Sequence, residues 1–257
     1  MNLSGLKYGD TDPNLGKKIK ELILSTDTFI VYLDEDDVIQ WSTSGKTGFG
    51  DQFGSIQNQI SFWESISNRM FSKQESCDYK CLLAEGYARM LDDNNREAAQ
   101  DIINLTKDRI TIQAKEVLRQ EYLMASVMAT AAVVAALITS MVFKSVISNF
   151  LGKNVFDIYL TGLMGGIGAF VSATIRSKNY DPEIKTSKRI HRIDGILRIA
   201  YGIIAGVLIS IGIKANIIFG FINGIDRTIF VETFLGAVAG ASESILPNII
   251  KQMEGKV

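Results

Sequence analysis

Charged residues inside apolar stretches are the groups of this chain that could do chemistry. Arg198 and Glu243 each lie near one end of an apolar stretch, and Arg176 ends another. A charge within a bilayer is costly unless it is paired or faces water. We therefore expect Glu243 to pair with Arg198 or Arg176, with the hydroxyl of Ser242 beside it. Such a polar site is either a structural clamp or a gate that contacts ions.

Metal and enzyme motifs are incomplete in this sequence. Cys77 and Cys81 are the only cysteines, and the only histidine, His191, is far from both. They form a poor zinc motif and are expected to be reduced thiols on successive turns of a cytosolic helix. His191 stands alone in a basic loop, without the serine and acid of a triad. We expect no enzyme, no cofactor and no metal.

Two further segments resemble ligand-binding motifs but lack residues that those motifs require. The Gly45-Lys46-Thr47 segment lacks the first glycine of a phosphate loop, because Gln40 stands there. The acidic run 34–37 lacks the glycine and glutamate of a calcium loop. We interpret these segments as a flexible glycine-rich loop and a solvated acidic turn. A net charge of −1 argues against nucleic acid as a partner.

Four apolar stretches carry the residues of the expected polar site, at about 123–143, 155–175, 196–213 and 229–250. A run of about 20 apolar residues matches the thickness of a bilayer core. We expect membrane lipid around these stretches. Glu232 and Asp157 lie near their outer ends, where we expect them to reach headgroup water.

The polar first half is expected to fold in the cytosol. Asp12-Pro13 is typical of a helix start, and Leu15, Ile19, Leu22 and Ile23 follow at helical spacing. Residues 28–33 indicate a short strand or buried turn, and helices are expected at 55–71, at 79–91 and from 96 onward. Because no glycine or proline occurs between 95 and 143, the last helix is expected to continue into the first span.

The sequence therefore predicts an all-α integral membrane protein with four transmembrane helices. They follow a small, mainly helical cytosolic domain with a short strand at most. The expected parts are a cytosolic domain at 1–95, a juxtamembrane helix at 96–122, a membrane domain at 123–250 and a tail at 251–257. The basic 176–195 loop places both termini in the cytoplasm by the positive-inside rule.

Small residues recur four apart in three of the four stretches. The pairs, one per stretch, are Gly162 and Gly166, Gly202 and Gly206, and Gly236 and Gly240. This spacing lets helix backbones approach closely. One four-helix bundle has limited room for so many small faces, so we expect part of this surface to join copies into a homo-oligomer.

Residues 80–254 resemble a loosely defined set of bacterial multi-pass membrane proteins. The resemblance is carried by Gly-Gly-x-Gly-x-x-x-Ser at 165–172 followed by Arg176, by Arg198 at the head of the third span, and by Gly-x-Ser-Glu at 240–243. The aromatic and arginine that adjoin this last element in the family are missing here. Some such proteins accompany anti-phage systems, which implies a membrane effector of the bacterial inner membrane.

These observations lead to one main functional prediction. It is an inner-membrane effector of bacterial defence or stress, in which a cytosolic sensing domain acts on an oligomeric part that disturbs the membrane or forms a pore. The alternatives are a non-conducting scaffold that recruits a separately encoded cytosolic protein, and a small constitutive channel.

Overall fold

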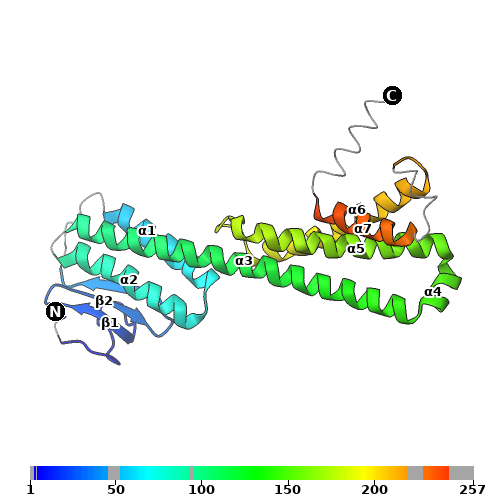
Figure 1. The fold of residues 1–257 in the computed structure, drawn as a ribbon. Coiled ribbons are helices and arrows are strands. Elements are labelled where there is room, and N and C mark those ends of the chain that lie inside the picture. The colour runs from blue at the N-terminus through cyan, green and yellow to red at the C-terminus, as the bar shows by residue number, and fades with distance from the viewer. Residues whose placement is uncertain (1–2, 4, 46–52, 93–94, 219–227, 243–257) are drawn as a thin grey trace. The chain divides into compact units, whose positions relative to one another are not determined.

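The computed structural model describes residues 3, 5–45, 53–92, 95–218 and 228–242 (Figure 1). Close contacts divide the chain into two compact units, Met1–Val117 and Leu118–Val257. Helix α3, Arg96–Val142, is 47 residues long and contains the boundary. The predicted continuity of this helix is confirmed, and each unit holds one half of it.

The first unit contains a three-stranded antiparallel sheet. Its strands are connected in sequence order, as β1 (Ile19–Ser25), β2 (Phe29–Asp34) and β3 (Ile39–Thr43). The strand predicted at 28–33 is the central strand β2, and all six of its residues are buried. The sheet means that this domain is not purely helical.

The helix predicted after Asp12 is wrong, because this segment forms a turn and then β1. Asp12 is fully buried, and its carboxylate accepts hydrogen bonds from the Asn14 amide (2.8 Å), Tyr32 (3.1 Å) and Ser42 (2.8 Å). The Asn14 bond closes an aspartate turn instead of capping a helix. The chain then turns back through Gly16, whose φ of +67° favours glycine.

Three helices complete the first unit as the apolar periodicity predicts. They are α1 (Phe53–Met70), α2 (Lys73–Asp92) and the first half of α3. Ser72 and Glu75 form a capping box at the start of α2, and the Asn95 side chain accepts the Ala98 amide at the start of α3. Helix α2 packs on the sheet through β1 and β2 (Figure 1).

Helices are the only regular elements among the described residues of the second unit. It comprises the second half of α3, α4 (Lys144–Leu151), α5 (Lys153–Arg176), the short helix η1 (Ser177–Asn179), α6 (Lys188–Lys214) and α7 (Thr228–Ala241). Three helices, α3, α5 with η1, and α6, are long and apolar enough to cross a membrane. Helix α7 is apolar but shorter, and the rest of the predicted fourth span lies outside the described residues.

Large apolar side chains are exposed on all four of these helices. Examples are Met128 on α3, Ile175 on α5, Tyr201 on α6 and Phe230 on α7, each more than half exposed. A soluble protein rarely exposes apolar surface on this scale. This surface is compatible with a multi-pass membrane protein whose helices face lipid.

Glycines set the close packing of α5, α6 and α7. A Cβ atom added to Gly206 of α6 would lie 2.5 Å from the Thr161 carbonyl oxygen of α5, and one added to Gly236 of α7 would lie 2.6 Å from the same oxygen. A Cβ on Gly240 would overlap the Gly165 carbonyl. Only glycine permits these backbone approaches.

All six glycines singled out in the sequence lie at crossings among these three helices. Gly162 and Gly166 face Val207 and Ile203 of α6, and Gly202 faces Gly165 and Ala169 of α5. One protomer therefore accommodates all of the small faces of α5, α6 and α7. The glycine pattern gives no support for a ring of copies, and oligomerisation stays a prediction.

Candidate functional site

The predicted polar site is only partly within the described residues. Arg198 of α6 donates a hydrogen bond to the hydroxyl of Ser172 on α5 (3.1 Å), and Ser172 is buried. Arg176 ends α5, and the Ser242 amide donates to the carbonyl of Val238 (3.0 Å). Glu243 lies outside the described residues, so its pairing with Arg198 or Arg176 stays a prediction.

A second polar cluster lies at the opposite ends of the same helices. It consists of Asp157 in the second turn of α5, Ser210 and Lys214 near the end of α6, and Glu232 in the second turn of α7. We call these four residues the Lys214 cluster. It arises because α5 and α7 begin where α6 ends.

Lys214 joins two carboxylates in this cluster. Its ammonium lies 3.4 Å from Glu232 Oε1 and 3.5 Å from Asp157 Oδ2. The Ser210 hydroxyl donates to Glu232 Oε2 at 3.0 Å, so both oxygens of Glu232 have a partner. Two carboxylates therefore share one ammonium in a bundle of apolar helices, and Glu232 also accepts a hydrogen bond from the Ser210 hydroxyl.

The burial of Glu232 corrects the expectation that it reaches headgroup water. The residue is only 1% exposed, and Ser210 beside it is fully buried. An ionised carboxylate that loses its water must gain a cation or hydrogen bonds, and Lys214 and Ser210 supply both. Lys214 could not be singled out from the sequence, because a lysine at a helix end is typical of a side chain that reaches water.

The other end of the bundle is held by aromatic and charged contacts. Arg192 forms a two-pronged ion pair with Glu121 of α3, at 2.5 and 3.1 Å. The ring of Tyr180 stacks on Tyr122 with 4.8 Å between centroids, and its hydroxyl shares a 2.8 Å hydrogen bond with His191 Nδ1. His191 is 4% exposed, so the histidine expected in a basic loop belongs to the buried packing.

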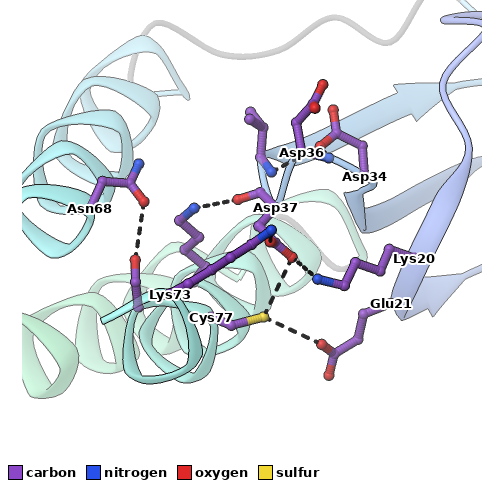
Figure 2. A network of polar contacts seen from close by, with 11 residues as sticks. Lys20, Glu21, Asp34, Asp36, Asp37, Asn68, Lys73 and Cys77 are labelled. Carbon is purple, nitrogen blue, oxygen red and sulfur yellow. Dashed lines mark hydrogen bonds and ion pairs between the residues drawn. The ribbon is translucent and has the colours of Figure 1, made fainter. Parts of the chain in front are cut away.

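The acidic turn of the first unit is solvated only in part, because Glu35 and Asp36 are exposed whereas Asp34 and Asp37 are buried. Asp34 is 1% exposed and Asp37 is 3% exposed. The Asp37 carboxylate contacts Lys20 of β1 and lies 3.0 Å from the Lys73 ammonium of α2, and its carbonyl accepts a hydrogen bond from buried Lys80 (Figure 2). Three lysines thus hold this turn between the sheet and α2.

The pKa of Asp37 reflects these lysines. Burial disfavours its charged form, but the hydrogen bonds from Lys20 and Lys73 outweigh burial and lower the pKa below its ordinary value of 3.8. The contact with Asp37 also raises the pKa of Lys20. Asp37 is therefore an ionised carboxylate paired with lysines at neutral pH.

Two half-buried thiols lie beside this network. Cys77 Sγ lies 3.8 Å from Glu21 Oε2 and 4.0 Å from Asp37 Oδ1 (Figure 2). Burial, and after it the charge of Glu21, raises the pKa of Cys77 and raises the pKa of Cys81 to about 12. The proximity of Glu21 to the cysteines was not predictable from the sequence, because it depends on the packing of α2 against β1.

Comparison with known proteins leaves the family open. No protein-family model, no curated protein and no solved structure matches this chain. The function therefore has to be argued from the two units and their polar clusters.

Proposed function

We propose that this chain is an inner-membrane effector of a bacterial defence or stress system, in which a cytosolic unit controls a membrane part that disturbs the bilayer. The proposal includes four spans, of which α7 belongs to the fourth, and both termini in the cytoplasm. The observation that supports it best is the Lys214 cluster. Charged groups within apolar helices are costly and are commonly retained for function.

The cluster is suited to a gate because its charges do not cancel. Two carboxylates and one ammonium leave a net negative charge when all three are ionised, at a place where α5, α6 and α7 meet. Separation of α6 from α7 would part Lys214 from Glu232 and expose an acidic group able to attract cations. The same contacts hold the bundle closed while they persist.

Helix α3 offers the connection that an effector needs. Its first half contributes Ile103 and Ile110, both fully buried, to the first unit, and its second half contributes Val133 to the core of the second. A helix is stiff along its axis, so a change in the packing of the first unit has a direct mechanical connection to the bundle.

The experiment is a potential-sensitive dye in bacteria that express the chain, with and without phage challenge. We expect a loss of membrane potential that depends on expression or on infection. In Glu232→Gln, we expect the size of this loss to change. Glu35→Gln is the matched control, because Glu35 forms an exposed ion pair with Lys18 in the first unit. A steady potential under both conditions, with the protein found in the membrane, would refute the effector.

One observation favours the scaffold as a second candidate function. An open groove in the first unit runs between α2 and α3, lined by Phe71, Tyr79, Leu82 and Arg109 among others. Ile112 at its edge is 70% exposed. The lining combines apolar side chains with Arg109 and the carboxylates of Glu75 and Asp78, a mixture that suits a separately encoded cytosolic protein. Capture of the same protein by wild type but not by Ile112→Asp would support this function.

A further inference from the structure

We propose that Glu21, Cys77 and Cys81 form a binding site for a thiophilic divalent cation, with Zn²⁺ as the best match. Among the residues that the structure describes, these three bring one donor atom each to within 4.8 Å of one another. The site lies in the first unit and is independent of the proposed membrane function.

The fold places the three donors from two elements. Cys77 and Cys81 lie one turn apart on α2, so their thiols leave the helix on the same side. Glu21 belongs to β1, on which α2 packs. Helix and strand thus present two sulfur atoms and one carboxylate oxygen to a common point, and both cysteines are only half-buried, which leaves a path for entry.

The separation of the donors fits tetrahedral coordination. With Zn–S near 2.3 Å and Zn–O near 2.0 Å, sulfur and oxygen on one tetrahedron lie about 3.5 Å apart and two sulfurs about 3.8 Å apart. The distance from Cys77 Sγ to Glu21 Oε2 is 3.8 Å, so small side-chain movements suffice. Three protein ligands leave the fourth position to water or to another donor.

The surroundings favour a cation that binds sulfur. Asp37 lies 4.0 Å from Cys77 Sγ and is itself tied to Lys20 and Lys73, so it could orient the site from the outside (Figure 2). Thiolate ligands select Zn²⁺ over Mg²⁺ or Ca²⁺, which prefer oxygen.

The test uses the full chain in detergent, reduced and stripped of metal. Zn²⁺ is titrated against a chromophoric chelator, and Co²⁺ is added separately as a spectroscopic probe. We expect one Zn²⁺ per chain and a thiolate-to-cobalt charge-transfer band. Each of Cys77→Ser and Cys81→Ser should reduce affinity at least about tenfold and weaken the band, because a thiolate ligand is lost.

Two carboxylate variants keep the test independent of folding. Glu21 is exposed, so Glu21→Gln should leave the fold intact and still weaken Zn²⁺ binding by about tenfold. Glu85→Gln, on the helix that carries both cysteines and in an exposed pair with Arg89, should bind as the wild type does. A wild type that holds no Zn²⁺, or cysteine variants with unchanged affinity and band, would overturn the site.

Discussion

A close crossing of α5 and α6 in the second unit makes a sharp prediction at Gly206. A Cβ on Gly206 would lie 2.5 Å from the Thr161 carbonyl oxygen, 3.1 Å from the Gly162 Cα and 3.2 Å from the Gly165 Cα. All three atoms are backbone, so none can move aside by rotation of a side chain. Since ordinary contact begins at 3.4 Å, the substitution Gly206→Ala requires α5 and α6 to separate by up to 0.9 Å (3.4 minus 2.5).

The cost of this separation follows from packing energies. A radial gap of roughly 0.5–1 Å forfeits a quarter to a half of each van der Waals contact along the crossing. Insertion of one methyl group into a tight core costs about 1–3 kcal/mol, and an immobile backbone places this site at the upper end. We therefore expect Gly206→Ala to lower the free energy of unfolding by about 3 kcal/mol.

Gly162→Ala is the matched control, because it lies at the same crossing in the same helix pair. Its Cβ would meet the Val207 side chain at 2.8 Å, while the nearest backbone atom, the Ile203 oxygen, is at an ordinary 3.4 Å. Because the Val207 side chain can adjust, we expect Gly162→Ala to lower the free energy of unfolding by no more than about 1 kcal/mol.

The assay measures the free energy of unfolding of wild type and both variants in detergent micelles. Unfolding is driven either by steric trapping or by a denaturing detergent. A second readout, the oligomeric state, separates packing within one chain from packing between copies. Equal stabilities for Gly206→Ala and Gly162→Ala would refute the crossing geometry. Loss of an oligomer at unchanged protomer stability would assign the glycine to contacts between copies.

Three further changes test the polar clusters and the core of the first unit. Lys214→Met should destabilise the second unit by about 3–5 kcal/mol because it leaves a buried carboxylate without its cation, and adding Glu232→Gln should recover part of the loss in the same unfolding assay. Asp37→Asn should lower the free energy of unfolding by about 2 kcal/mol at neutral pH. Since the folded pKa of Asp37 is lowered, its contribution is present above pH 3.8 and is lost as the pH falls through the folded value, so the two proteins should converge in acid. Ile103→Ala, at a fully buried position, should cost about 2–5 kcal/mol, against under about 0.5 for the exposed Ile112→Ala. Both tryptophans lie in the first unit, so their fluorescence reports its unfolding.

The helices were predictable because their signals are local. The apolar spacing of α1 and the unbroken run of α3 each depend on neighbouring residues within one element. Three of the predicted spans coincide with helices that are long and apolar enough to cross a bilayer, and their signal was also local, since it is an apolar run of about 20 residues with few charges.

The sheet was harder to predict because its signals are short and interrupted. In β1 the pairing with β2 shifts between Ile19 and Glu21 and again between Leu22 and Leu24, so the apolar residues lose the alternation of a regular strand. The apolar residues of this segment therefore have a spacing in the sequence that also fits a helix. The deciding residue was Asp12, whose partners Tyr32 and Ser42 are 20 and 30 residues away.

The Lys214 cluster could not be predicted either, because its contacts also join residues that are distant in the sequence. Lys214 pairs with Glu232, 18 residues on, and with Asp157 on another helix, and neither pairing has a motif. The glycines were predictable as packing residues, but their partners were not. Only the crossing of α5, α6 and α7 shows that the small faces meet within one chain.

The Lys214 cluster bears directly on the choice between effector and scaffold. While Lys214 contacts both carboxylates, the cluster favours a closed bundle, and opening it would expose Glu232 without its cation at a cost of several kcal/mol. A constitutive channel would meet this cost at all times, whereas an effector meets it only when a signal supplies the energy. α3 contributes buried residues to both units, so in the proposed effector repacking of the first unit would supply that energy. If Lys214→Met made the chain leaky without any challenge, the cluster would be the closed gate. If the variant were only less stable and remained tight, the cluster would be a clamp and the scaffold would be favoured.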